Sequence, residues 1–150
     1  DRLKDHYFIN LIGHPIEATL AISRLIFDGV LETHPGLKII VSHGGGYLPS
    51  YSGRMDHAYR ARKDVRDGLP HLPSEYLKKM YFDTMVFEPD QIEYLISKYG
   101  KDHILLGTDY PYDMGEEDPV GLVKRVQGLN PHDCASICGG NAAKLLKINS

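Results

Sequence analysis

The chain has 150 residues, of which 42% are hydrophobic and 25% charged, proportions typical of one soluble globular domain rather than of a disordered or fibrous protein. A formal net charge of −3, with no basic stripe interleaved with aromatic residues, argues against a nucleic-acid partner. The apolar runs are too short to cross a membrane and the charged opening residues do not form a signal peptide, so we expect a cytoplasmic protein with no membrane partner.

Two features of the sequence bear on processing and on cysteine chemistry. It does not begin with Met, which predicts a processed or truncated piece. Cys134 and Cys138 stand four residues apart, and two cysteines are too few for a disulfide framework. We expect two reduced thiols on a helix. The alternative is a metal-binding pair, but no His or Cys follows to complete a tetrahedral site.

The first half of the chain predicts a helix over 16–33, a strand over 37–42 and a second helix over about 48–62. The first helix has apolar residues at helical spacing, and His34-Pro35-Gly36 ends it. The strand is a compact β-branched run, which is typical of a buried parallel strand. It continues directly into His43-Gly44-Gly45-Gly46.

The second half predicts strands and helices in alternation. In order we expect a loop containing Pro70 and Pro73, a short helix 74–79 capped by Ser74, a strand 80–86, a helix 88–99, a strand 103–109, and helices 119–127 and 133–146. This alternation predicts right-handed βαβ units and an α/β fold with a parallel sheet. A closed eight-stranded (β/α) barrel needs about 250 residues, and a small open α/β sheet, which 150 residues could form, would usually start with a strand. This chain starts with a polar loop and a helix. We therefore expect a single-domain fragment, residues 1–150, that begins after a strand.

Functional residues of parallel α/β folds gather where the strands end. The three predicted strands end at His43, near Val86-Phe87-Glu88, and at Asp109. Histidine and aspartate are residue types that bind metals and transfer protons. The sequence therefore predicts that His43 and Asp109 are functional-site residues.

Each of these two residues has a plainer alternative. The glycines after His43 allow a tight turn and close approach to a ligand, which favours an acid/base or metal-binding role over a packed turn residue. A phosphate-binding loop of the Walker type is excluded, because no Lys-Ser/Thr pair follows. Asp109 ends a buried strand, where an unpaired charge is costly, so we favour a metal ligand over a helix cap or a salt bridge.

The other candidates carry weaker signals. His14 precedes the first helix and reads as a polar residue at a helix start, with a site role as the alternative. His57 stands in a predicted helix with Arg54, Arg60 and Arg62, a cluster that reads as a solvated face or as an anchor for an anionic substrate. Asp83 reads as an orienting residue or a hydrogen-bonding partner within the barrel. The remaining histidines read as surface residues: His6, His34, His71, His103 and His132.

Four motifs in fixed order resemble a known family. They are Ser42-His43-Gly44-Gly45-Gly46, Gly53-Arg54, Tyr81-Phe82-Asp83-Thr84 and Leu106-Gly107-Thr108-Asp109-Tyr110-Pro111, followed by a closing Gly140-Asn141-Ala142-Ala143-Lys144-Leu145-Leu146. The chain resembles the C-terminal half of the amidohydrolase-related family that contains aminocarboxymuconate-semialdehyde decarboxylase and γ-resorcylate decarboxylase. The resemblance implies about strands six to eight, with their helices, of an amidohydrolase-type TIM barrel.

The resemblance also implies roles for four residues. Asp109 would be a ligand of a divalent metal, most commonly Zn²⁺ with Mn²⁺ as the alternative, and His43 the catalytic histidine beside the metal-bound water. Arg62 would reach the site of a neighbouring subunit of a homo-oligomer, a dimer, and hold a substrate carboxylate. Tyr112 would line the pocket.

The chain departs from the family in its metal ligands. The family also has a His-x-His pair on the first barrel strand and a histidine on the fifth, and neither stands here. His6 and His14 lack the sequence context of the missing ligand. We therefore expect this chain by itself to bind a metal weakly or not at all.

The resemblance implies non-oxidative decarboxylation of a small aromatic or muconate-type carboxylic acid. Hydrolysis of an amide, ester or lactone on the same barrel is an alternative, because a fold does not fix a reaction. A third alternative is a half-barrel without catalytic activity that acts only through self-association.

Overall fold

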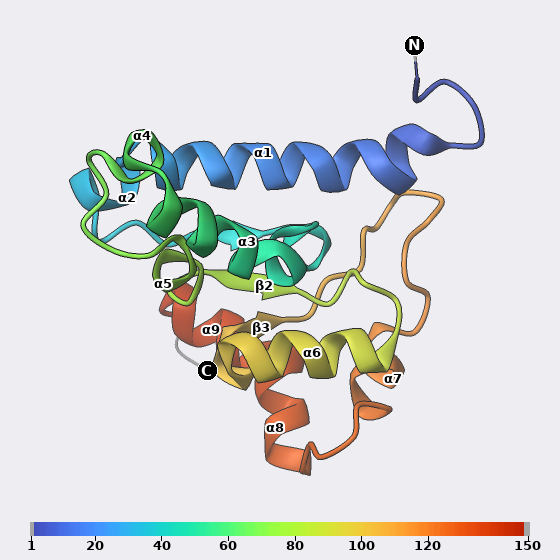
Figure 1. The fold of residues 1–150 in the computed structure, drawn as a ribbon. Helices are drawn as coiled ribbons and strands as arrows, with labels where there is room; N and C mark the ends of the chain where they lie inside the picture. The colour runs from blue at the N-terminus through green and yellow to red at the C-terminus, as the bar shows by residue number, and fades with distance from the viewer. Residues whose placement is uncertain (1, 149–150) are drawn as a thin grey trace. The chain divides into compact units, whose positions relative to one another are not determined.

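A computed structural model describes residues 2–148 of the chain, which divides into two compact units, Asp1–Met80 and Tyr81–Ser150 (Figure 1). The first unit contains, in order, the π-helical turn η1 (Ile9–Gly13), α1 (His14–Phe27), α2 (Val30–Thr33), β1 (Ile40–Val41), the 3₁₀ turn η2 (His43–Gly45), α3 (Leu48–Ala61), α4 (Lys63–Arg66) and α5 (Pro73–Leu77).

The predicted helix over 16–33 is two helices in the structure. Gly29 adopts a positive φ of 72°, which ends α1 and separates it from α2. Glycine has no Cβ, so the left-handed conformation is available to it at little cost. The helical region also begins earlier than predicted, because η1 continues into α1 at His14.

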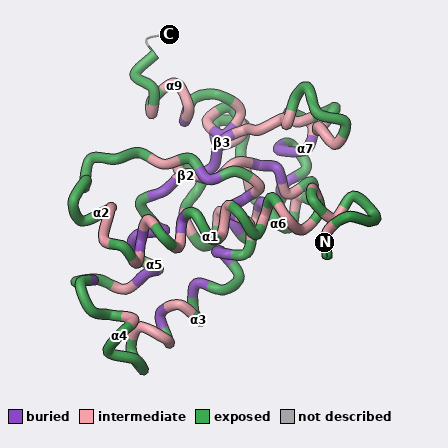
Figure 2. Tube along the Cα trace, turned by 90° about the horizontal axis from the view of Figure 1, so that it is seen from above, coloured by how far each residue is buried: buried purple, intermediate pink, exposed green. Residues whose placement is uncertain are grey.

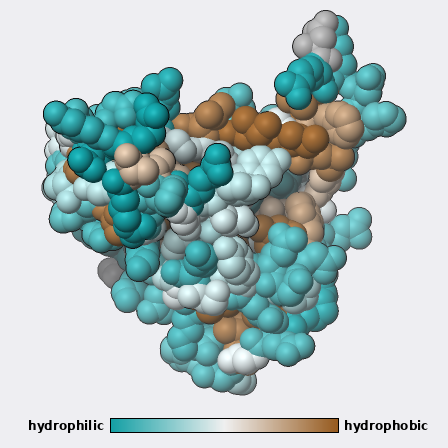
Figure 3. All heavy atoms as spheres, viewed as in Figure 1, coloured by the Kyte–Doolittle hydropathy of each residue, from teal (hydrophilic) through white to brown (hydrophobic). Residues whose placement is uncertain are grey.

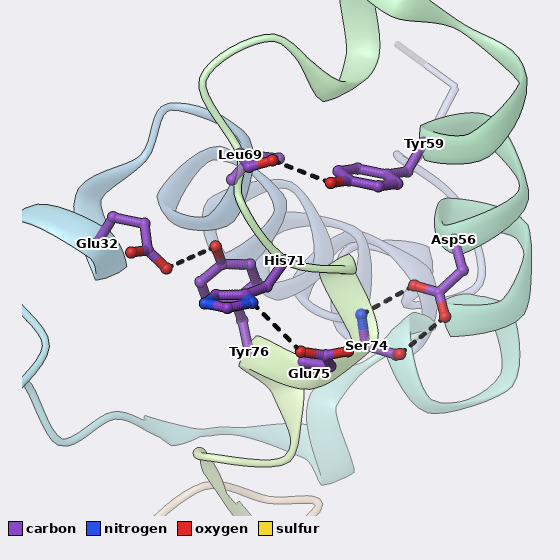
Figure 4. Close-up of polar contacts among 8 residues, drawn as sticks. All are labelled: Glu32, Asp56, Tyr59, Leu69, His71, Ser74, Glu75 and Tyr76. Atoms are coloured by element: carbon purple, nitrogen blue, oxygen red, sulfur yellow. Dashed lines mark hydrogen bonds and ion pairs between the residues drawn. The ribbon is translucent and has the colours of Figure 1, made fainter.

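Polar contacts join α5 to the helices around it (Figure 4). The carboxylate of Asp56 on α3 accepts hydrogen bonds from the Ser74 backbone N–H, at 2.9 Å, and from its hydroxyl, at 2.7 Å. The prediction that Ser74 caps this helix is therefore wrong: α5 begins at Pro73, and the Ser74 hydroxyl is satisfied by Asp56. The Tyr76 hydroxyl donates to Glu32 at 2.6 Å, which joins α5 to α2.

Apolar side chains remain exposed along the first helical stretch of the unit. Figure 3 shows them as a band over η1 and α1. They are Ile9, Leu11, Ile16 and Leu20, and Leu20 is 54% exposed. The opposite side of α1 buries Ile22 and Ile26. The helix is thus apolar on two sides, and only one of them is covered.

The second unit contains β2 (Tyr81–Asp83), α6 (Pro89–Tyr99), η3 (Lys101–His103), β3 (Ile104–Leu105), α7 (Pro119–Lys124), α8 (Pro131–Ala135), the π-helical turn η4 (Ser136–Gly140) and α9 (Asn141–Leu146). β2 and β3 pair in parallel, with Phe82 beside Ile104 and Asp83 beside Leu105. The parallel pairing confirms the prediction made from the βαβ pattern.

The core of the second unit lies where α6 packs on the strands. Buried positions follow β2, β3 and the inner side of α6 (Figure 2), where Ile92 and Leu95 are almost fully covered. The Phe82 ring stacks on Tyr99, with ring centroids 4.2 Å apart. His103, predicted to be a surface residue, is half-buried and stacks on Tyr81.

Asn141 fastens the last helix to the start of β3. Its side chain is buried, and its amide nitrogen donates to the carbonyl oxygens of Lys101 at 2.9 Å and Ile104 at 2.8 Å. The Lys101 ammonium also pairs with Asp133 on α8 and holds the pKa of that carboxyl below its ordinary value. Polar contacts with Lys101 therefore join both α8 and α9 to the start of η3.

Several predicted elements differ from those observed. The strands are shorter than predicted, α4 forms inside a stretch predicted to be loop, and the predicted helix over 133–146 comprises parts of α8, η4 and α9. Cys134 and Cys138 are free thiols, as predicted, and burial raises the pKa of the Cys138 thiol. Within residues 2–148, none of the helices has the length and apolar character needed to span a membrane.

Candidate functional site

His43 stands directly after β1, at a sharp change in chain direction. Its backbone φ is 56°, and the three following glycines also have positive φ values of 57°, 85° and 58°. The turn is closed by a hydrogen bond from the Gly46 N–H to the His43 carbonyl, at 2.9 Å. Four successive left-handed residues require the glycines, which confirms the expected tight turn.

The turn that follows β1 rests on the first turn of α1. A Cβ added to Gly46 would lie 2.4 Å from the Pro15 carbonyl oxygen and 2.8 Å from the Thr19 hydroxyl oxygen. That hydroxyl accepts a hydrogen bond from the Tyr47 N–H at 3.0 Å and donates to Pro15 at 2.7 Å. The start of α1 therefore determines where the His43 turn lies.

The same contact brings His14 to His43. The two imidazole rings stack with centroids 6.1 Å apart and planes 23° from parallel. His14 is exposed, whereas His43 is half-buried. The sequence favoured a plain helix-start role for His14, and no periodic pattern in the chain signals this contact.

Asp109 belongs to the second unit, in the segment after β3. It is half-buried and has a backbone φ of 54°. The segment leading to it is fixed by the Gly107 N–H, which donates to the fully buried Thr84 hydroxyl at 3.1 Å. A Cβ on Gly107 would lie 2.9 Å from the Met85 side chain and 3.2 Å from the Asp83 Cβ, so glycine eases the close approach of this segment to the end of β2.

The loop after Asp109 contains Tyr112. Backbone hydrogen bonds close it, from Tyr112 to the Asp109 carbonyl at 2.8 Å and from Glu116 to the Thr108 carbonyl at 2.9 Å. Tyr112 is 74% exposed in this structure. The sequence-predicted site residues Asp109 and Tyr112 are thus brought into one loop, while His43 lies in the other unit.

The three strand ends share an unusual backbone conformation. His43 after β1, Phe87 after β2 and Asp109 after β3 all have positive φ, although none is glycine. Such residues are uncommon and concentrate at functional sites, where surrounding structure holds them against a cost of about 1–3 kcal/mol. The sequence reasoning selected the same three strand ends, but it did not single out Phe87 as a residue.

Arg62 is not near His43 within the first unit. It ends α3, a helix of 14 residues that begins shortly after the glycine turn, so about 20 Å separate the two ends of that helix. Its guanidinium makes two hydrogen bonds to Asp64, at 2.7 Å and 3.1 Å, and these raise the pKa of Arg62 and lower that of Asp64. That length argues against a role for Arg62 at the His43 of its own chain.

A cavity of about 570 Å³ lies toward this far end of α3. Phe27, Tyr51 and Met55 give it apolar walls, and Arg54 and Asp64 contribute charged groups. Arg54 lines this hollow, and all four members of the predicted cluster are exposed, as expected for a solvated face: Arg54, His57, Arg60 and Arg62.

The described residues do not make a metal site by themselves. Across residues 2–148, no group of three or more His, Cys, Asp or Glu side chains stands close enough together to hold a metal ion. The Asp109 carboxylate is a suitable donor for a divalent cation, but structural and catalytic sites need at least three protein ligands. A resident metal would thus require ligands beyond these residues.

Comparison with known proteins identifies the family. Residues 6–148 match the amidohydrolase family model. Over 150 residues the chain is 34% identical to 2-amino-3-carboxymuconate-6-semialdehyde decarboxylase of Dictyostelium discoideum, covering 99% of this chain and 42% of that protein. The chain thus spans less than half the length of this relative.

Solved structures agree. The fold matches 5-carboxyvanillate decarboxylase from Sphingomonas paucimobilis with a TM-score of 0.87 and 25% identity, over 99% of this chain and 45% of that one. A dihydroxybenzoic acid decarboxylase from Polaromonas, solved with manganese and 2-nitroresorcinol, matches with a TM-score of 0.79 and 27% identity, over 91% and 41%. The predicted α/β fold of the amidohydrolase barrel type is confirmed, and the chain belongs to the amidohydrolase family.

Proposed function

We propose that this chain carries the proton-transferring histidine of a non-oxidative decarboxylase of small aromatic or muconate-type carboxylic acids. The observation that carries the proposal is His43, an imidazole at a strand end whose left-handed backbone is held by three glycines. The proposal is supported by relatives and structural neighbours that bear the names of such decarboxylases. Strain of this kind is retained where a side chain must be placed for chemistry.

His43 supplies the proton that replaces the carboxyl group. The bond between the substrate carbon and its carboxylate breaks, the electron pair stays on the carbon, and CO₂ leaves. The N–H proton of the imidazolium moves to that carbon, and the neutral imidazole regains a proton from water. One proton is consumed for each CO₂ released, and histidine is the side chain that most often serves as a general acid or base in enzymes.

Asp109 is proposed as one ligand of a divalent metal, the others coming from outside the described residues. A bound cation would supply charge stabilisation for the substrate oxygens. Zn²⁺ is our first choice, and the manganese in the Polaromonas structure makes Mn²⁺ the second. Asp109→Ala should lower the metal content after dialysis, and an unchanged stoichiometry would refute the assignment.

The test uses the protein as its native gene encodes it, supplied with Zn²⁺ or Mn²⁺. With 2,6-dihydroxybenzoate and 5-carboxyvanillate as probes, we expect CO₂ release and, in D₂O, one deuterium on the carbon that lost the carboxylate. His43→Ala and His43→Asn should lower kcat by about 10²–10⁴-fold while leaving bound metal unchanged. His34→Ala is the matched control, an exposed histidine of the same unit, and should keep wild-type turnover.

Three other outcomes would replace the proposal. Hydrolysis of an ester, amide or lactone without CO₂ release would make the protein a hydrolase, in line with the name of its family model. Loss of metal in His43→Ala would make His43 a ligand rather than a proton carrier. The absence of any turnover, together with self-association, would favour a half-barrel without catalytic activity.

A further inference from the structure

The stacked pair of His14 and His43 links the strand end to a helix from an earlier part of the chain. The 6.1 Å separation and the 23° inclination lie within the favourable range for aromatic pairs, about 4.5–7 Å between centroids. His14 is the first residue of α1, a helix of 14 residues with Pro15 next to it. The helix therefore fixes the backbone of His14, the first partner in the contact.

The backbone on the other side is equally constrained. Thr19, one turn into α1, receives the Tyr47 N–H at 3.0 Å, and the missing Cβ of Gly46 lets the turn meet Pro15 directly. These contacts flank the two rings, since they hold the residues just after His14 against those just after His43. The backbones that carry the two rings are consequently held at a fixed separation.

We propose that His14 is a positioning residue: its ring, stacked on His43, holds that imidazole in the orientation from which it transfers its proton. The inference rests on the proposed role of His43. Rotation of the His43 ring about its Cβ–Cγ bond would change its nearly parallel contact with His14. A proton donor that is already oriented toward the reacting carbon transfers its proton faster, and a small misplacement of such a group lowers the reaction rate.

A merely structural role for His14 makes different predictions. His14 is exposed and starts a helix, so loss of its side chain should change folding stability little. A positioning role requires a ring, but not an ionisable one. His14→Phe keeps a ring of similar breadth, whereas His14→Ala and His14→Gln remove it.

The experiment compares these three variants with His34→Ala in the protein as its native gene encodes it. We expect His14→Ala and His14→Gln to lower kcat about tenfold with little change in KM, and His14→Phe to recover most of the loss. In NMR spectra, the ring-proton signals of His43 should shift in the Ala and Gln variants and move back toward wild type in the Phe variant. His34→Ala should change neither readout.

The outcomes separate this inference from the proposed function. If His43→Ala is inactive while His14→Ala retains wild-type kcat and an unchanged His43 signal, the positioning role is wrong and the proposed function stands. An inactive His14→Phe variant whose His43 signal is restored would also overturn positioning by a ring. If His43→Ala retains full activity, the proposed function itself fails, whatever the NMR signals show.

Discussion

At the scale of single residues, the glycine turn contains a position that does not tolerate a side chain. Gly44, Gly45 and Gly46 all have positive φ, but Gly46 has in addition no room for a side chain. Its neighbours there are the Pro15 carbonyl and the Thr19 hydroxyl, and the carbonyl is backbone inside a helix that cannot move aside cheaply. The position of His43 therefore depends on the smallest residue beside it.

Gly46→Ala should destabilise the protein by about 2–5 kcal/mol, the sum of a left-handed alanine and an overpacked contact. Gly36→Ala is the matched control, because nothing lies within 4 Å of a Cβ at that position. Urea unfolding midpoints measure both changes. Equal midpoints for the two variants would show that the turn adapts to a Cβ after all.

The sequence allowed part of this site to be predicted. His43 and Asp109 were selected because each ends a β-branched or apolar run, a local pattern that needs no tertiary information. The contact of His14 with His43 could not be found in this way. It arises because the start of α1 packs on the glycine turn, and that packing depends on a missing Cβ and one threonine hydroxyl rather than on periodicity.

At the scale of elements, short polar links decide where the helices dock. Asn141 is the clearest, since one amide group donates to both Lys101 and Ile104 at the start of β3. The Lys101 carbonyl lies just before β3, and Ile104 is the first residue of that strand. Asn141 thus holds α9 against the start of the strand that leads to Asp109.

Asn141→Asp should destabilise the protein by about 2–4 kcal/mol, because a carboxylate cannot donate and would face two carbonyl oxygens in a buried place. Asn130→Asp provides the control. Asn130 caps α8 by accepting the Asp133 N–H at 2.9 Å, and aspartate caps a helix equally well, so its effect should be small. Thermal unfolding of the two variants distinguishes a donor role from a general effect of added charge.

The elements themselves were predicted with uneven success, for physical reasons. The helix over 88–99 was predicted to within one residue of α6, because Pro89 and Gly100 mark both of its ends. The helix over 16–33 was predicted as continuous because its apolar pattern is continuous; the left-handed Gly29 overrides that pattern. β1 and β3 span only two residues each, and Ile40 in β1 is 49% exposed, so the apolar runs overstated the length of both strands and the burial of the first.

At the scale of the whole molecule, a second copy of the chain would have two roles: covering an exposed surface and supplying an arginine to the site. The exposed apolar band of η1 and α1 is a surface that association could cover. Arg62, at the far end of α3, is poorly placed to serve the His43 of its own chain, yet the family resemblance gives an arginine at this position a substrate carboxylate to hold. We therefore propose a dimer in which Arg62 of each subunit acts at the site of the other.

Mixing two variants tests this arrangement. His43→Ala and Arg62→Ala should each be inactive or severely impaired alone, the second through a raised KM for carboxylate substrates. If Arg62 acts across the interface, a heterodimer has one site that carries both substitutions and one that carries neither. Random re-association of equal amounts should then restore about a quarter of wild-type activity, because half of the dimers are mixed and each has one intact site.

The activity of this mixture can be interpreted only with two controls. Arg54→Ala, which alters the cavity without removing the Arg62–Asp64 pair, should be assayed in parallel to show that restoration is specific to Arg62. Light scattering must show about twice the mass of one chain of the protein used, in every sample. No restoration in a mixture shown to contain heterodimers would mean that Arg62 does not act across the interface, and its ion pair with Asp64 would then be structural.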